Sequence, residues 1–87
     1  MAYTTVNVAI PVIKTKKGHH EMGSPVRAST ADEAKRRAER MSQTRAGGIA
    51  ISRSGDAEFG EFDGPILLGV FGDVPSALLR TLNATPF

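Results

Sequence analysis

A capping box near the middle of the chain is the feature that most constrains the fold, because it fixes where a helix begins. Thr30 is a favourable N-cap residue and Glu33 follows three positions later, so each side chain is expected to bind the backbone N–H of the other residue. An apolar stripe continues at spacings of three and four residues through Ala34, Ala38 and Met41. The sequence predicts a helix over residues 31–45, ended by a left-handed glycine at Gly47 or Gly48.

Segments of alternating polarity flank this helix and predict strands. Residues 3–14 place one apolar side chain at every second position, which is the period of a half-buried strand: Val6, Val8, Ile10 and Val12. Pro11 has no N–H to donate, so we expect this strand at a sheet edge, or bent or bulged there. Residues 49–53 alternate in the same way and predict a strand after the helix.

The remaining segments are less regular. Residues 66–71 are apolar on both faces, which predicts a strand that is central or covered on two sides. Residues 54–65 are glycine-rich and acidic, and they are expected to close a long hairpin because they are too few for a helical crossover. Residues 19–27 form either a returning strand or an irregular connection. Residues 76–82 predict one or two helical turns whose buried side carries three leucines: Leu78, Leu79 and Leu82.

Together these segments predict a single α+β domain over residues 1–87. One main α-helix packs on a small antiparallel or mixed sheet of three to four strands, with a short C-terminal helical turn. The helix stripe is mostly alanine, which permits a close approach to the sheet but buries little apolar area.

The composition and the N-terminal sequence limit the cellular compartments in which we expect the protein. The chain has no cysteine, so it holds no disulfide and no thiolate metal site. The N-terminal residues do not have the pattern of a signal peptide, and no apolar run reaches the roughly 20 residues needed to cross a bilayer. We expect a soluble cytoplasmic protein that does not enter a membrane.

No residue pattern predicts catalysis, a metal site or a cofactor. His19 and His20 point to opposite faces if they lie on a strand, so a solvent-exposed turn is favoured over a metal site. The acidic loop around Asp56 lacks the order of calcium ligands, since Gly60 and Glu61 stand where the EF-hand pattern requires a ligand and a glycine. No serine stands in a G-x-S-x-G elbow, so an enzyme is the third choice of function.

Charge is distributed unevenly although the formal net charge is only +2. Six basic residues are candidates for contact with an anion or a nucleic acid: Lys14, Lys16, Lys17, Arg36, Arg37 and Arg40. Residues 56–63 are acidic, which predicts a bipolar molecule able to steer an anionic partner or to meet a second copy basic face to acidic face. Three acids interrupt the basic helix and no aromatic residue accompanies it, so a solvated face is the alternative.

Four short motifs resemble those of a group of small uncharacterised bacterial proteins. These proteins share a helix, a glycine-led apolar strand and three turn-like motifs, which here correspond to residues 48–51, 52–56, 60–62 and 72–75. The resemblance implies a bacterial source and brings no activity or site residues with it.

The favoured hypothesis for function is a non-enzymatic interaction module that associates with itself, as a dimer. A thin core and apolar residues in the sheet and its long loop indicate a surface that a second copy covers. The candidate interface residues are Phe59, Phe62, Ile66 and Leu68. The alternative from a different class is a nucleic-acid-binding protein that uses the basic helix face and the turn at residues 14–17.

Overall fold

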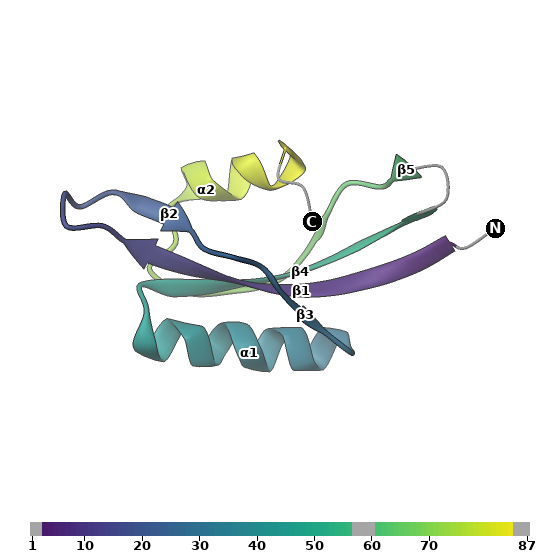
Figure 1. The fold of residues 1–87 in the computed structure, drawn as a ribbon, viewed down its shortest axis with the longest axis horizontal. Helices are drawn as coiled ribbons and strands as arrows, with labels where there is room; N and C mark the ends of the chain where they lie inside the picture. The colour runs from purple at the N-terminus through teal and green to yellow at the C-terminus, as the bar shows by residue number, and fades with distance from the viewer. Residues whose placement is uncertain (1–2, 57–60, 85–87) are drawn as a thin grey trace.

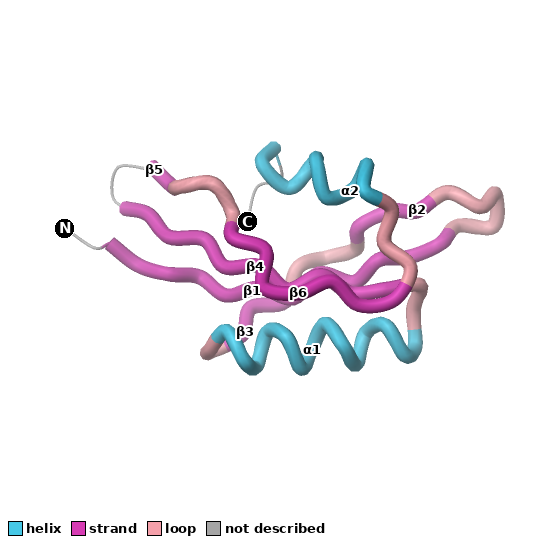
Figure 2. Tube along the Cα trace, turned by 180° about the vertical axis from the view of Figure 1, so that it is seen from behind, coloured by secondary structure: helices cyan, strands magenta, loops and turns pink. Residues whose placement is uncertain are grey.

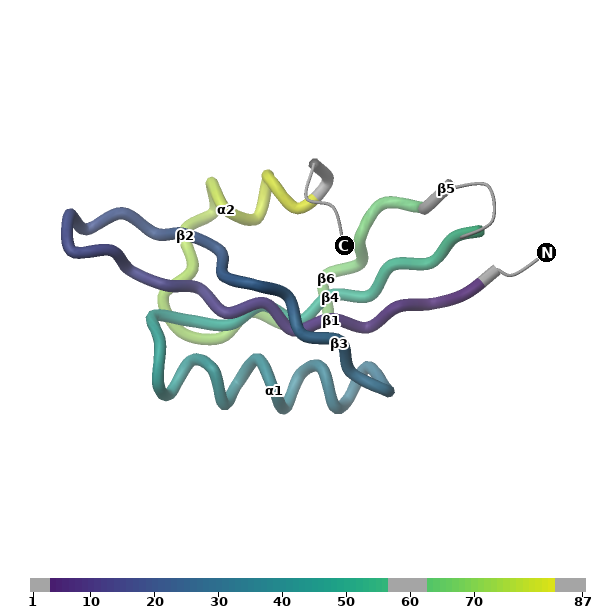
Figure 3. The backbone as a smooth tube through the Cα atoms, viewed as in Figure 1, coloured from purple at the N-terminus to yellow at the C-terminus, as the bar shows by residue number. Residues whose placement is uncertain are grey.

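The computed structural model describes residues 3–56 and 61–84. Its elements, shown in Figure 1 and as a tube in Figure 3, are β1 (Tyr3–Lys14), β2 (His20–Met22), β3 (Val26–Ala28), α1 (Ala31–Thr44), β4 (Gly47–Asp56), β5 (Glu61–Phe62), β6 (Ile66–Gly72), α2 (Ser76–Arg80) and a 3-10 turn (Thr81–Ala84). The predicted α+β class, with one main helix and a short C-terminal helix, is confirmed. The predicted segment 19–27 contains both alternatives, because β2 and β3 are separated by three irregular residues.

The six strands of the described chain form one sheet in which every pairing is antiparallel. β1 and β4 lie side by side in its centre. β2 and β3 share the outer side of β1, and β5 and β6 share the outer side of β4. The sheet is therefore four strand positions wide. β4 and β6 are joined as the predicted long hairpin, which β5 closes by pairing with Gly55 and Asp56.

The edge placement of the first strand is wrong. β1 pairs with β4 along Tyr3–Val12 and has a second neighbour on its other side, so it lies inside the sheet. The missing N–H of Pro11 affects the neighbour instead: β3 pairs with Asn7–Ala9, β2 pairs with Val12–Lys14, and the outer row is broken between them. The Gly23 N–H donates to the Pro11 carbonyl oxygen at 2.8 Å and spans this break.

The prediction that residues 66–71 are central or covered on both faces is also wrong. β6 pairs only with β4 within the described residues, so it is an edge strand. Three of its side chains are substantially exposed: Ile66 at 61%, Leu67 at 48% and Val70 at 37%. An apolar run on both faces is typical of a buried strand, but here it marks a strand that the chain itself leaves partly uncovered.

Helix α1 begins as predicted, with the Glu33 N–H donating to Thr30 Oγ1 at 3.1 Å. The reciprocal bond goes to the Ser29 N–H, which donates to Glu33 Oε2 at 3.1 Å, and not to the N–H of Thr30. Arg37 donates to Glu33 as well, and these two bonds to the carboxylate hold the pKa of Glu33 below its ordinary value.

The glycine cap predicted for the helix C-terminus is wrong. The helix ends at Thr44, and Arg45 continues in extended backbone with φ of −129°. Gly47 and Gly48 instead begin β4, where the helix lies very close to the strand. A Cβ atom at Gly48 would collide with the backbone carbonyl of Ala38, so only glycine permits this approach.

The two helices cover opposite faces of the sheet, and the two faces differ in side-chain size (Figure 1). On the α1 face the buried residues are small: Ala9, Ala34, Ala38 and Ala50. On the α2 face they are larger: Val8, Ile10, Val12, Ile49, Ile51 and Leu82. The predicted burial of Leu82 is confirmed, with Leu78 and Leu79 half-buried beside it. The larger aliphatic side chains of β1 therefore pack under the short C-terminal helix and not under α1.

Candidate functional site

Edge strand β6 carries the two most exposed large apolar side chains among the described strands, Ile66 and Leu67. Figure 2 looks onto this edge, with β6 in front of β4 and β1. The strand runs for seven residues without a charged side chain, in the sequence ILLGVFG. It ends at Gly72, whose positive φ of 78° turns the chain out of the sheet, and the Asp73 N–H then donates to the Ala46 carbonyl oxygen at 2.9 Å.

A β-bulge in β6 determines which face each of its side chains occupies. Gly69 is opposite Ala50 and Leu67 is opposite Ile51, so Leu68 is an extra residue with no opposite partner on β4. Leu68 and Phe71 pack with the alanines on the α1 face. Leu67 and Val70 are opposite Ile51 and Ile49, which belong to the cluster on the α2 face. Ile66 is opposite Ser52 and lies on the same face as Leu68, so both faces of the edge carry an exposed aliphatic side chain.

Two of the four interface residues expected from sequence lie on this strand. Ile66 is exposed, whereas Leu68 is half-buried against α1. Phe59 lies outside the described residues, and for Phe62 the structure describes only its place in β5. Sequence reasoning missed Leu67 and Val70, because a run that is apolar at every position contains no alternation that would show which side chains face outward.

The six candidate basic residues fall into two groups. Lys14, Lys16 and Lys17 lie at the end of β1 and in the turn to β2, and all three are exposed. Arg36, Arg37 and Arg40 lie along α1. Arg37 Nη2 is 2.8 Å from Glu33 Oε1, so its charge is largely neutralised, whereas Arg40 lines a shallow hollow with Arg37, Met41 and Thr44.

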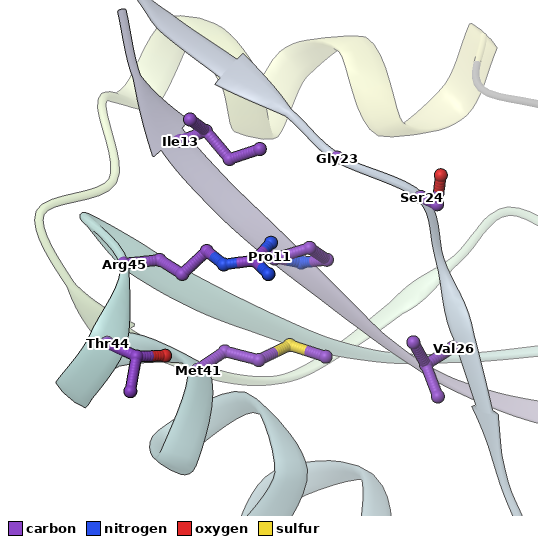
Figure 4. A pocket seen from close by; sticks show the side chains of 8 residues that line it. All are labelled: Pro11, Ile13, Gly23, Ser24, Val26, Met41, Thr44 and Arg45. Carbon is purple, nitrogen blue, oxygen red and sulfur yellow. The ribbon is translucent and has the colours of Figure 1, made fainter.

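A larger hollow of about 470 Å³ lies where α1 ends beside the break in the outer row of strands (Figure 4). Its walls combine apolar and polar side chains: Pro11, Ile13, Gly23, Ser24, Val26, Met41, Thr44 and Arg45. Figure 4 shows Met41 and Arg45 extending alongside each other across it. Arg45 is the one charged residue among these described lining residues, so the hollow brings together no acid–base pair for catalysis.

Lys14 joins Arg45 in a neighbouring hollow that also includes Thr44 and Asp73. The structure therefore brings Lys14, Arg40 and Arg45 to one end of α1. Lys16 and Lys17 line none of these hollows. Arg45 was missed as a candidate because its position suggested a helix C-terminus and nothing more.

The histidine pair does not form a metal site with the described acids. His20 Nε2 is 2.8 Å from Asp73 Oδ2, and this contact ties β2 to the turn between β6 and α2. Over residues 3–56 and 61–84, no three His, Asp or Glu side chains gather in a way that would hold a metal ion.

In the described part of the chain, neither helix combines the length and the hydrophobicity needed to span a bilayer. Comparisons of the chain with protein-family models, with curated proteins and with solved structures give no match. The resemblance to small bacterial proteins therefore stays a prediction, and the case for function depends on the two surfaces described above.

Proposed function

We propose that this protein is a non-enzymatic interaction module that associates with itself through the outer edge of β6. The observation that carries the proposal is an edge strand of seven uncharged residues whose Ile66, Leu67 and Val70 are 61%, 48% and 37% exposed. The outer backbone groups of such a strand can pair with another strand, and natural proteins usually protect such an edge. β6 carries none of the charges or prolines that would prevent pairing.

A second copy of β6 is the partner that best fits this edge. Two copies related by a two-fold axis pair antiparallel, and neither strand brings a charge to the other. The association would also add apolar burial to a core that is thin, since the fully buried residues between α1 and the sheet are four alanines, two of them from α1.

Light scattering after size exclusion tests this proposal. At high micromolar concentration the mass is expected to be twice the chain mass of 9.2 kDa, and it should fall toward the single-chain value on dilution. A clean monomer at high micromolar concentration would remove self-association as the function.

A second candidate function, nucleic-acid binding, is supported by the placement of Lys14, Arg40 and Arg45 around one end of α1. Such binding depends on phosphate contacts, so affinity should be submicromolar at low salt and should fall steeply as salt rises. Replacing Arg40 and Arg45 together by glutamate reverses two of these charges and is expected to abolish it. Absence of binding to a single- or double-stranded oligonucleotide at low salt would eliminate this candidate.

A further inference from the structure

We infer that two copies of β6 pair in one specific register, in which Leu67 of each copy stands opposite Val70 of the other. This inference depends on the proposed self-association and specifies its geometry. The residue numbers of opposite residues then sum to 137, so Ile66 meets Phe71 and Leu68 meets Gly69. The two-fold axis passes between Leu68 and Gly69.

The β-bulge is what selects this register. Residues directly opposite each other in an antiparallel pair must point to the same face of the sheet. In β6 the α1 face holds Ile66, Leu68, Gly69 and Phe71, and the α2 face holds Leu67, Val70 and Gly72, as their opposite residues on β4 and the two core clusters indicate. Alternation is thus interrupted once, between Leu68 and Gly69.

Without the bulge, residues on the same face would differ by even numbers, and only even sums would be allowed. Across the bulge the allowed sums become odd. A sum of 135 places Leu67 opposite Leu68 on the other face, and a sum of 139 places Gly69 opposite Val70 on the other face. A sum of 140 places Leu68 opposite Gly72, again on the other face. Only the sum of 137 matches the faces of all six residues from Ile66 to Phe71.

This register also pairs suitable side chains. Leu67, at 48% exposure, meets Val70, at 37%, so two partly exposed aliphatic groups cover each other twice, once on each side of the axis. Ile66, the most exposed of the three, meets the Phe71 ring on the other face. Leu68 meets Gly69, which has no side chain to oppose it. The same symmetry places both copies of α1 on one side of a continuous sheet.

Cysteine cross-linking tests the register directly, because the chain contains no cysteine of its own. The double variant Leu67→Cys/Val70→Cys places two thiols opposite two thiols in the proposed dimer, at a separation that suits a disulfide. Under mild oxidation nearly all of this variant should migrate as a covalent dimer on a non-reducing gel. Mass spectrometry of the digested dimer should find residue 67 joined to residue 70.

Two control variants separate register from chance collision. Leu67→Cys alone has no thiol opposite it, and Ile66→Cys/Val70→Cys places its thiols on opposite faces, so both should remain mainly monomeric on the gel. If the unmodified protein is a dimer by light scattering but the three variants cross-link equally, the register is wrong while self-association stands. If the unmodified protein is a monomer, the proposed function fails first.

A second measurement avoids substitutions in the strand. In a sample mixed from labelled and unlabelled chains, intermolecular nuclear Overhauser effects are expected between the methyl groups of Leu67 and Val70. Contacts from Leu67 to Leu67 across the interface would overturn the register, because they belong to a sum of 134.

Discussion

The two edges of the sheet are built differently. The edge beside β1 consists of β2 and β3, two pieces of three residues each that include the exposed charges Glu21 and Arg27. The edge beside β4 contains β6, a single run of seven residues with no charge. Figure 1 faces the first edge and Figure 2 the second.

The difference shows which edge is protected against pairing. Short strands, charged side chains and interruptions are the devices by which soluble proteins keep an edge from adding another strand. The β2–β3 edge has all three, and its interruption at Gly23 lies beside Pro11. The β6 edge has a bulge at Leu68, which is a further device of this kind, but it carries no charge and is not shortened. For this reason we assign the association to β6.

The largest expected effect is a loss of stability when α1 can no longer pack closely on β4, next to β6. Gly48→Ala forces a Cβ against the backbone carbonyl of Ala38, so α1 must move away from β4, and Phe71, which is opposite Gly48, loses its cover. We expect a loss of about 3 kcal/mol in the free energy of unfolding, measured by urea denaturation at one fixed protein concentration.

Gly23→Ala is the matched control on the other edge. Its Cβ would lie 2.9 Å from Pro11 Cγ, in a ring that can only change its pucker, and 3.3 Å from Ile13 Cδ1, at the flexible end of a side chain, so no backbone atom has to move as far as at Gly48. A cost of about 1 kcal/mol is expected. Equal costs for the two alanine variants would contradict the close seating of α1 on β4.

The next effect is on the dissociation constant of the dimer. It is tested at two equally exposed valines, one on each edge of the sheet. Val70 in β6 and Val26 in β3 are each 37% exposed. Val70→Lys places a charge in the proposed interface and should weaken the dimer by about 2 kcal/mol, or roughly 30-fold in dissociation constant. Val26→Lys should leave dissociation unchanged. Analytical ultracentrifugation of both variants decides, and equal behaviour would show that the two edges do not differ in function.

A smaller effect on stability is expected at the N-terminus of α1, which follows β3. Thr30→Ala removes the hydroxyl that accepts the Glu33 N–H, at a cost of about 1 kcal/mol or roughly a 5 °C lower Tm. Ser29→Ala keeps the backbone N–H that donates to Glu33 and serves as the control. Equal Tm values for Thr30→Ala and Ser29→Ala in thermal melts would contradict the cap geometry.

The same helix N-terminus gives the smallest expected effect, a dependence on pH. The pKa of Glu33 is lower in the folded chain than in the unfolded one, so the ionised carboxylate stabilises the fold above its unfolded pKa. That stabilisation should disappear as the pH falls through the lowered folded value. The difference in Tm between the unmodified chain and Glu33→Gln should therefore be present at neutral pH and vanish in acid. A difference in Tm that does not change with pH would contradict this stabilising role of the Glu33 carboxylate.

The sequence alone predicted an element correctly where its pattern depends on local chemistry. The capping box located the start of α1, and alternation located β1 and β4, because both patterns report contacts within or next to the same segment. The three leucines of residues 76–82 were also correctly assigned to the side that packs on the core, because helical spacing places them on one side of a helix.

The failures concern position in the sheet, which is decided by distant segments. Pro11 was read as a sign of an edge, but β1 keeps its outer neighbours by dividing them into β2 and β3 around the proline. Residues 66–71 were read as central, because an apolar run does not reveal whether its cover comes from the same chain. Gly47 and Gly48 were read as a cap, whereas Gly48 is required by the approach of Ala38 from the helix.

Amide hydrogen exchange of the unmodified protein at two concentrations tests the central claim most directly, since it reports both edges in one molecule. At high micromolar concentration the outward-facing amides of β6 should be protected, and dilution should release them, while β2 and β3 exchange at the same rate in both samples. Protection of β6 that does not change with concentration, or a change confined to β2 and β3, would contradict the assignment of association to the β6 edge.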